Sequence, residues 1–199
     1  MMSKGTGKQA KVLTPAMERA VLSHIESSSR YPARDRVIFL FSVKAGLRAI
    51  EIGNVTWSMV TDGEGAIGDT LALPNIATKG RTGGRTIALH KQLKAALIDL
   101  AAEGGIQPDM PVIRSERGNK MNGRTITKWF IKVYTALGWD GVTSHSGRRT
   151  FITNIAREIS AVGGSIRDVQ NLAGHSSLEN TRLYIDAHND AQKRVIDRI

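Results

Sequence analysis

Six polar residues spread along the chain are of types that could act together on a phosphate group. Arginine, lysine and histidine side chains bind phosphate oxygens through charge-assisted hydrogen bonds, histidine and lysine also transfer protons, and a tyrosine hydroxyl can attack phosphorus. These residues are, in chain order, Arg48, Lys79, His145, Arg148, His175 and Tyr184.

The first two of these residues also have an ordinary structural explanation. Arg48 lies in GLRAIEI, three residues before Glu51, and an arginine–glutamate pair at this spacing is most often structural. Lys79 lies in IATKGRTGGRTIAL between two expected strands, where a single lysine is usually an exposed hairpin residue. Neither residue alone indicates a function.

His145 and Arg148 in SHSGRRTF are three positions apart and therefore share one face of an expected helix. Ser144 is a good N-cap for that helix. Both residues would then lie in the first turn, where free amides and the helix dipole favour an anion. Taken by itself, however, this pair is a weak signal.

The segment NLAGHSSLENTRLYI carries the last two residues of the series. Gly174 is expected to end one helix, and His175 follows it directly. Ser176 and Glu179 form a capping box that predicts a short helix, with Tyr184 on it nine residues after the histidine. A tyrosine in such a helix is ordinarily a packing residue, so the ordered series, rather than this tyrosine alone, indicates a function.

The composition excludes several other classes of site. The chain has 199 residues, with 28 Lys and Arg against 18 Asp and Glu, a net charge of +10 and no cysteine. Disulfides, thiolate metal sites, iron–sulfur clusters and a cysteine nucleophile are therefore ruled out. The longest apolar run, Val37–Phe41, is far shorter than the roughly 20 residues of a membrane-spanning helix. We expect one soluble, intracellular globular domain.

The basic residues are clustered along the sequence. Five of them fall between Asp69 and Asp99 without any acid, and six between Arg114 and Lys132 meet a single acid. Clusters of this kind favour a nucleic-acid partner over a merely solvated surface.

Helix signals occupy most of the chain and define the elements that must position these residues. Thr14-Pro15 is a cap followed by proline at the first helical position, which predicts a helix to about Ser27. Pro32 begins a second helix that closes near Gly46. Further helices are expected at Lys91–Glu103, at Gly123–Leu137, and from Ser144 onward in pieces broken at Gly163-Gly164, Gly174 and about Asp186.

Three short segments are expected to be strands, at Val55–Val60, Thr70–Leu73 and Thr86–Leu89. Between the first two, glycines at 63, 65 and 68 have the spacing of a dinucleotide-binding loop. The acids around them and the strand that follows favour a hairpin turn instead. The predicted fold class is α+β, mainly α-helical, with a small antiparallel three-stranded sheet.

The ordered series resembles the catalytic residues of the tyrosine recombinases, the phage-integrase family, and the similarity runs from about Thr14 to Tyr184. All six family positions are filled in the right order. They are the first arginine in G-L-R-x-x-E (Arg48), the hairpin lysine (Lys79), the H-x-x-R box (His145 and Arg148), the histidine of L-G-H (His175) and the nucleophile (Tyr184).

The sequence departs from the family pattern in three places. Gly147 and Ala173 each stand where a leucine is usual, and ISAVGGS makes one connection slightly long. These departures affect packing more than chemistry.

The resemblance implies a tyrosine-recombinase-like catalytic domain in which Arg48 and Arg148 neutralise the charge that grows on the phosphate during attack. Lys79 would protonate the leaving 5′-oxygen. The bond energy is kept in a 3′-phosphotyrosyl enzyme, so the resemblance implies no cofactor, neither ATP nor a metal ion.

Tyr184 is the nucleophile in this scheme. Because a tyrosine hydroxyl has a reference pKa of about 10, it must lose its proton during the attack. His145 is the expected acceptor, and His175 would hydrogen-bond the phosphate.

The expected partner is double-stranded DNA, bound by a homo-tetramer on synapsed sites, with a monomer free in solution. Residues 1–13 are expected to be a basic tail, 14–186 the catalytic domain, and 187–199 a tail helix that docks on a neighbouring subunit or on its own domain. The resemblance also places the protein in the cytoplasm of a bacterium or phage host, at the nucleoid. Further expected DNA contacts are Arg81, Arg85, Arg124, Lys128 and Arg149.

Other interpretations remain open at this stage. Family members generally carry a helical core-binding domain of about a hundred residues before the catalytic domain. This sequence is either such a catalytic domain alone or similar to the short single-domain members. A type IB topoisomerase-like enzyme shares most of the site, and a catalytically silent DNA-binding regulator is a third possibility.

Overall fold

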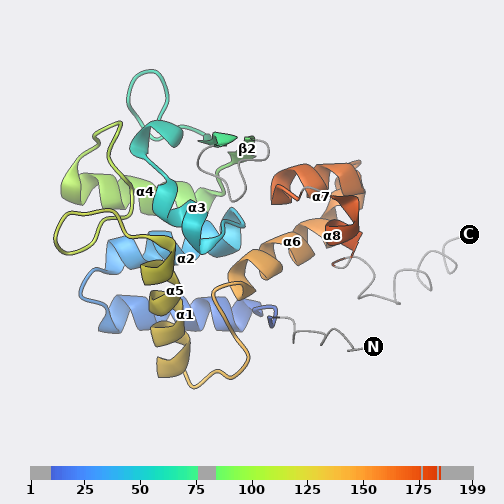
Figure 1. Ribbon diagram of the computed structural model, residues 1–199, viewed down its shortest axis with the longest axis horizontal. Coiled ribbons are helices and arrows are strands. Elements are labelled where there is room, and N and C mark those ends of the chain that lie inside the picture. Colours follow the sequence, from blue (N-terminus) through green and yellow to red (C-terminus); the bar gives the residue numbers. More distant parts are fainter. Residues whose placement is uncertain (1–9, 76–83, 176, 183, 185–199) are drawn as a thin grey trace, which may run out of the picture.

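A computed structural model describes residues 10–75, 84–175, 177–182 and 184 of the chain. Helices dominate the described residues (Figure 1). The elements are α1 (Pro15–Ser28), α2 (Pro32–Lys44), α3 (Ala49–Asn54), η1 (Trp57–Met59), β1 (Thr70–Leu73), β2 (Arg85–Ala88), α4 (Lys91–Gly104), α5 (Gly123–Ala136), α6 (Ser146–Glu158), η3 (Ile159–Val162), α7 (Ile166–Ala173) and α8 (Leu178–Arg182).

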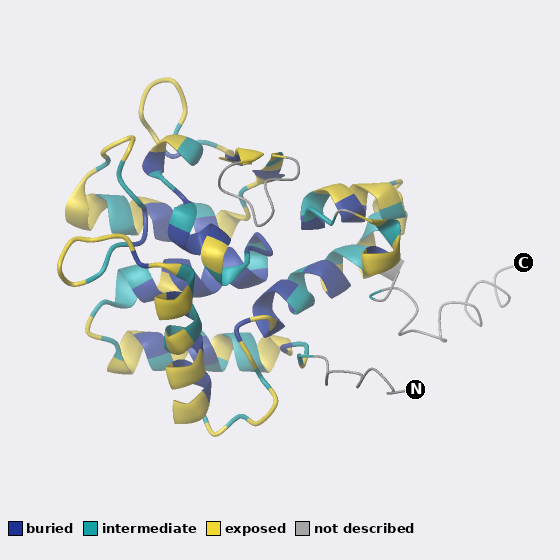
Figure 2. Ribbon diagram, viewed as in Figure 1, coloured by how far each residue is buried: buried dark blue, intermediate teal, exposed yellow. Residues whose placement is uncertain are grey.

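The central element of the main core is α2. Every residue from Val37 to Val43 is buried, and the helix packs against α1, α3, α4 and α6. A helix that is apolar all round is one that neighbours cover on every side. Buried residues accordingly run along α2 and along the part of α6 next to it (Figure 2).

Most of the predicted helix boundaries are confirmed within one or two residues. The Thr14 hydroxyl accepts a hydrogen bond from the amide of Met17 at the start of α1, and Pro15 is the first helical residue. Gly46, shortly after α2, and Gly174, at the end of α7, both have positive φ, at 63° and 61°. Left-handed backbone of this kind is easily adopted only by glycine, so both helices end where the sequence indicated.

In the part of the chain that the structure describes, the sheet has two antiparallel strands, not the three predicted. β1 pairs with β2 in the register Thr70↔Ala88 to Leu73↔Arg85, and both lie within one residue of their predicted ranges.

The predicted strand over Val55–Val60 is wrong. Its beginning makes one isolated β-bridge to Pro111, and the 3₁₀ turn η1 (Trp57–Met59) follows. The first two amides of η1 donate to the carbonyl oxygens of Met110 and Pro108, at 3.1 and 2.9 Å. Because the loop before α5 takes these donors, the segment buries its apolar side chains without joining β1.

A second, smaller core lies between α6 and α7. Ile152, Val169 and Ala173 are buried together, with Ile155 and Tyr184 packed against them. In Figure 1, α7 and α8 lie at the far end of α6, apart from the bundle that α1 to α5 form. The helix α6 therefore joins two hydrophobic cores, and residues in its first turns lie where the two meet.

No helix among the described residues is long and apolar enough to cross a membrane.

The contact between α2 and α6 explains the glycine at position 147. A Cβ atom built there would lie 2.3 Å from the Ser42 hydroxyl oxygen and 2.9 Å from a Val43 methyl carbon. Only glycine lets the two helices come this close. The close packing of α6 against α2 therefore explains why glycine stands at position 147, where a leucine is usual.

We predict that Gly147→Ala lowers the free energy of unfolding by about 1–3 kcal/mol, the usual range for overpacking a core. Urea denaturation followed by circular dichroism measures this. Gly63→Ala is the matched control, because a Cβ at Gly63 meets nothing within 4 Å. An effect of Gly147→Ala no larger than that of the control would contradict the packing argument.

Candidate active site

One cavity of about 290 Å³ brings together five of the six predicted catalytic residues. The sixth, Lys79, lies outside the described residues, as does Arg81. The residues that line the cavity are Ala10, Arg48, His145, Arg148, Arg149, His175 and Tyr184. Arg48 and Tyr184, which are far apart in the sequence, therefore line the same cavity.

Arg48 begins α3 directly after the turn at Gly46. Its backbone amide donates to Oε2 of Glu51 at 2.8 Å, and its guanidinium donates to Oε1 at 3.0 Å. Glu51 therefore accepts from both the backbone and the side chain of Arg48, which orients the guanidinium. The structural Arg48–Glu51 pair expected from the spacing is therefore present, and Arg48 also lines the cavity.

Glu51 is completely buried and is shared by a second arginine. Arg85, the first residue of β2, places its guanidinium nitrogens 3.3 and 3.1 Å from the two carboxylate oxygens. Burial by itself would raise the pKa of Glu51, but the hydrogen bonds and charges of Arg85 and Arg48 outweigh it and the pKa is lowered. The carboxylate is thus ionised at neutral pH.

Arg148 lies in the first turn of α6 and is 5% exposed. Its two terminal nitrogens donate to the carbonyl oxygens of Gly46 and Ala173, each at 2.6 Å. Burial, with the nearby charge of Arg48, lowers its pKa to about 9, so the guanidinium is still protonated at neutral pH. An arginine has five N–H donors, and these two bonds leave the others for an anion in the cavity.

His145 is the residue before α6 and takes the N-cap position, so the predicted N-cap at Ser144 is one residue early. The Thr143 amide donates to the Ser146 hydroxyl at 3.0 Å, the His145 amide to the Thr143 hydroxyl at 3.2 Å, and the Ser146 amide to the Thr143 carbonyl at 2.9 Å. These bonds hold the turn that precedes α6, so the helix does not begin with the predicted Ser144 cap. His145 is exposed at the mouth of the cavity.

His175 follows the left-handed turn at Gly174 and is held from two sides. Its amide and carbonyl both bond Gln170, and its Nδ1 lies 3.0 Å from the hydroxyl of Thr181 on α8. Burial lowers its pKa to about 4, and the positive charges of Arg148, Arg48 and Arg85 add to this. The imidazole is therefore neutral at pH 7 and carries one N–H donor and one acceptor nitrogen for hydrogen bonds.

Tyr184 lies in a turn just after α8 rather than on the helix as predicted. Its amide donates to the carbonyl oxygen of Thr181 on α8 at 3.0 Å. Its ring is stacked on that of His175, with centroids 5.7 Å apart. The guanidinium of Arg149 lies 6.0 Å from the same ring. Ser176 of the predicted capping box lies outside the described residues.

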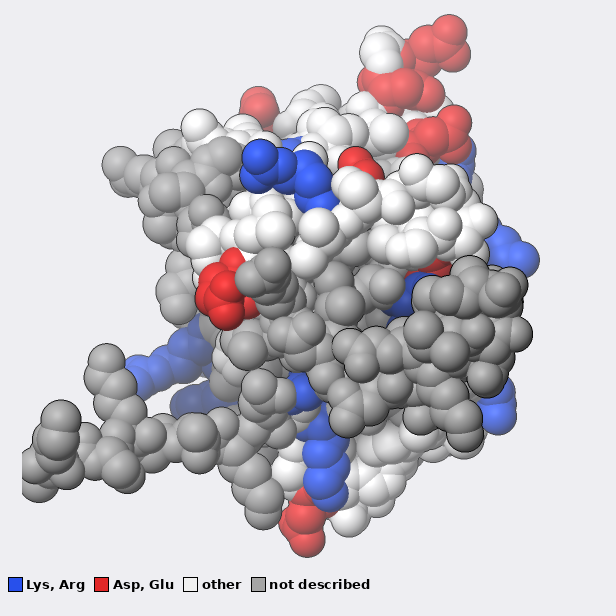
Figure 3. All heavy atoms as spheres, turned by 90° about the vertical axis from the view of Figure 1, so that its right-hand side faces the viewer, with Lys and Arg blue, Asp and Glu red and all other residues white. Residues whose placement is uncertain are grey.

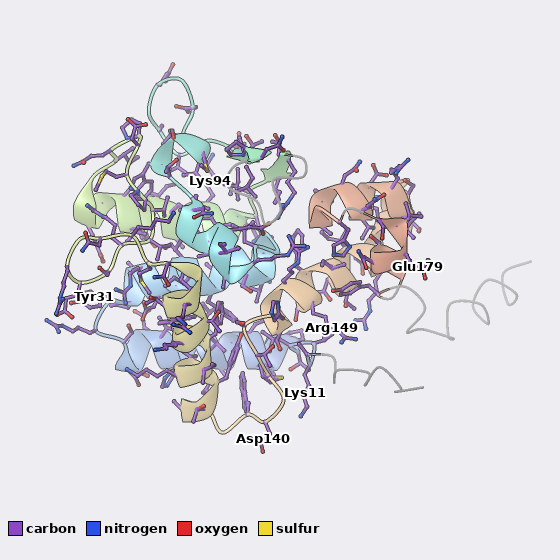
Figure 4. All side chains as sticks on the ribbon, viewed as in Figure 1. Lys11, Tyr31, Lys94, Asp140, Arg149 and Glu179 are labelled. Atoms are coloured by element: carbon purple, nitrogen blue, oxygen red, sulfur yellow. The ribbon has the colours of Figure 1, made fainter. Side chains whose placement is uncertain are left out.

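The predicted DNA contacts fall into two groups. The first group is Arg149, which lines the cavity, and two exposed residues of α5, Arg124 and Lys128. Arg124 lies in an adjoining groove that Arg48 and His145 also line. Figure 4 places Arg149 at the same end of the molecule as Glu179 of α8. Arg85 differs, because its side chain is only 7% exposed and faces Glu51.

The surface around α7 and α8 has mixed charge. Seen from that side, Lys and Arg side chains are exposed at several places, with Asp and Glu side chains between them (Figure 3). Among the described residues, no group of three or more histidine or carboxylate side chains could hold a metal ion.

Residues 11–191 match the phage integrase family, so the chain belongs to this family. A tyrosine recombinase XerA from Thermococcus onnurineus is 31% identical over 184 residues, which cover 87% of this chain and 57% of that protein. A tyrosine recombinase XerC from Rhizobium meliloti is 34% identical over 94 residues, 47% of this chain and 28% of that protein. The chain thus spans well under two thirds of the length of these relatives.

Solved structures of recombinases share the fold. The Tn1549 transposon integrase in complex with a circular intermediate DNA superposes with a TM-score of 0.73 at 20% identity, over 98% of this chain and 68% of that one. The XerA recombinase gives a TM-score of 0.70 at 21% identity, over all of this chain and 66% of that one. The α+β, mainly helical class is confirmed.

The environment of His175 predicts how stability depends on pH. Because its pKa is near 4 in the folded protein and about 6.5 when unfolded, the unfolded chain binds more protons between these values. The free energy of unfolding should therefore fall as the pH is lowered from 6.5 towards 4. Urea denaturation at several pH values should show this fall, and His175→Gln should lessen it.

An NMR titration of the His175 ring gives the direct check, with the resonance assigned from its loss in His175→Gln. The resonance should not titrate between pH 5.5 and 8. A midpoint near 6.5 would contradict the burial that the structure shows.

Proposed function

We propose that this chain is the catalytic part of a site-specific DNA recombinase that cleaves and rejoins DNA strands through a 3′-phosphotyrosyl intermediate. The observation that carries the proposal is the meeting of Tyr184 with Arg48 and Arg148 in one cavity. The family membership and the names of the relatives support recombination rather than DNA relaxation or regulation without catalysis.

The two arginines supply the charge that the reaction needs. A phosphodiester resists attack because its non-bridging oxygens are negative, and this charge grows in the pentacoordinate transition state. Arg48 and Arg148 are both held before any substrate arrives, one by Glu51 and one by two backbone carbonyls. Donors fixed in advance stabilise developing charge without reorganising at the moment of reaction.

The covalent step follows from the position of Tyr184. Its hydroxyl oxygen forms a bond to phosphorus, the bond from phosphorus to the 5′-oxygen breaks, and the phenolic proton passes to His145. His175 is neutral and donates a hydrogen bond to the phosphate. Lys79 gives a proton to the departing 5′-oxygen, so the products are a 3′-phosphotyrosyl protein and a free 5′-hydroxyl. Two guanidiniums and proton transfers between side chains account for the step without a metal ion or ATP.

The biological setting is a finer part of the same proposal. The partner is double-stranded DNA, and four subunits act together on two synapsed sites, each subunit being a monomer when free. Residues 14–186 are the catalytic domain, and 187–199 a tail helix that docks on a neighbouring subunit or on its own domain. The residues before 14 are a basic tail, anchored at Leu13, whose side chain is buried and whose amide donates to the Thr150 hydroxyl at 2.8 Å. The protein acts on the nucleoid in the cytoplasm, and Arg124, Lys128, Arg149 and Arg81 contact the DNA backbone.

Tyr184→Phe should abolish covalent attachment to DNA while leaving binding intact, because the change removes a single hydroxyl. The substrate is a pool of end-labelled duplexes with a randomised centre and single nicks, which traps adducts. The parent should give an SDS-resistant band, and the variant none. Sequencing the DNA in that band identifies the target site.

The other two tyrosines make this test specific. Tyr134 is 1% exposed, and burial raises its pKa further above the usual range. Tyr31 lies at the opposite end of the molecule from α8 (Figure 4). An adduct that persists in Tyr184→Phe would sink the assignment of the nucleophile.

Lys79→Ala should slow cleavage by roughly 10²–10⁴-fold, the usual effect of removing general acid catalysis. A DNA with sulfur at the 5′-bridging position has a leaving group that needs little protonation, since a thiol ionises near pKa 8.5. Lys79→Ala should cleave that DNA nearly as fast as the parent does. Arg148→Ala should gain much less from the sulfur. Equal slowness of Lys79→Ala on both DNAs would show that the lysine is only a phosphate contact.

A further inference from the structure

Arg85 was expected to contact DNA, but its surroundings are those of a buried residue. The side chain is 7% exposed, and the carboxylate that it meets, Glu51, is 0% exposed. Both terminal nitrogens face that carboxylate, one per oxygen, which is the two-pronged geometry that arginine forms and lysine cannot. A guanidinium held in this way is turned away from solvent and from any duplex lying on the surface.

The same guanidinium also touches the turn before His175. A Cβ atom built at Gly174 would lie 2.6 Å from Nη1 of Arg85 and 3.0 Å from its Cζ. The elements β2 and α7 pack together at this point. Arg85 therefore contacts two parts of the site. One is the Glu51 carboxylate, which holds Arg48, and the other is the turn at Gly174, which His175 follows.

The charges give this arrangement a consequence. Glu51 carries one negative charge, and two guanidiniums share it. If Arg85 were absent, Glu51 would belong to Arg48 alone, and the pair would be close to neutral. With Arg85 present, the three groups together keep one positive charge next to the cavity, which is what a phosphate requires.

We infer that Arg85 is a positioning residue of the site: it holds Glu51 so that Arg48 keeps its place and its charge, and it supports the turn that carries His175. This inference rests on the proposed function for its meaning in catalysis. Its structural part, the support of Glu51 and of the Gly174 turn, can be measured without any reaction.

The test compares Arg85→Met and Arg85→Lys with the parent chain in two assays. The first is the rate of adduct formation at saturating DNA, using the nicked duplex pool. The second is the salt dependence of affinity for an intact 30-base-pair duplex. Arg85→Met should form adducts roughly 10- to 100-fold more slowly with an unchanged salt slope, and Arg85→Lys should fall between Arg85→Met and the parent.

Two further variants calibrate these assays. Arg124→Met removes an exposed arginine of α5, and should lower the magnitude of the salt slope by about 0.9, the value for one lost phosphate contact. Arg30→Met removes an arginine from an exposed ion pair with Glu116 far from the site, and should leave both measurements unchanged. If Arg85→Met lowers the slope as Arg124→Met does and keeps the parent's rate, Arg85 is a DNA contact and the inference is overturned.

Hydrogen exchange separates this inference from the proposed function. The His175 amide bonds the Gln170 carbonyl, and in Arg85→Met and Arg85→Lys it should exchange at least tenfold faster than in the parent. Amides in α1 should not change. If the parent forms no adduct with any DNA, the proposed function fails, while exchange still decides whether Arg85 supports the turn. Arg85→Lys is the variant expected to keep the fold if Arg85→Met does not. If the His175 amide exchanges in Arg85→Lys at the same rate as in the parent, the inference is overturned.

Discussion

A single buried guanidinium holds the site together. Arg148 donates to the carbonyl oxygen of Gly46 after α2 and to that of Ala173 at the end of α7, and so ties the main core to the small core between α6 and α7. The Ala173 carbonyl belongs to a helix end, where backbone acceptors lack partners within the helix, and the Gly46 carbonyl lies in the turn between α2 and α3. The bonds therefore satisfy two buried backbone acceptors, and they place α3 and α7 on either side of the cavity.

This arrangement concentrates positive charge at some cost to the unliganded protein. Burial lowers the pKa of both Arg148 and His175, and neighbouring arginines lower each of them further. Glu51 is the acid that meets these arginines, and it is shared between Arg48 and Arg85. A bound phosphate would offset the repulsion between the cations, so part of the affinity for phosphate comes from relieving that repulsion. The same charges that destabilise the empty site therefore favour the anion and its transition state.

Local sequence signals predicted the helices well because each signal acts locally. Thr14-Pro15 begins α1, and Gly46 and Gly174 end α2 and α7 through backbone that other residues adopt at a cost. The predicted strand at Val55–Val60 failed for a different reason. Its apolar spacing suits either a strand or a tight turn, and the choice depends on backbone donors and acceptors fifty or more residues further along the chain.

In the site, too, features set by nearby residues could be predicted and those set by distant residues could not. Five of the residues that line the cavity could be predicted from their order and their match to a family pattern, and the Arg48–Glu51 pair from its spacing. Ala10, which also lines it, carries no such signal. Arg85 could not be assigned correctly, because nothing near it in the sequence shows that a carboxylate 34 residues earlier is its partner. Charge clustering predicts that arginines face a polyanion, but it does not distinguish an exposed arginine such as Arg124 from one that is buried against an acid.

A crystal structure of the Tyr184→Phe protein with its DNA tests this account most directly, because it shows where the scissile phosphate binds and what Arg148 does there. The account predicts that phosphate oxygens lie within about 2.7–3.2 Å of guanidinium nitrogens of both Arg48 and Arg148. It also predicts that Arg148 keeps its bonds to the carbonyls of Gly46 and Ala173. A phosphate bound in the groove beside α5 instead, or an Arg148 that leaves both carbonyls to reach it, would contradict the account.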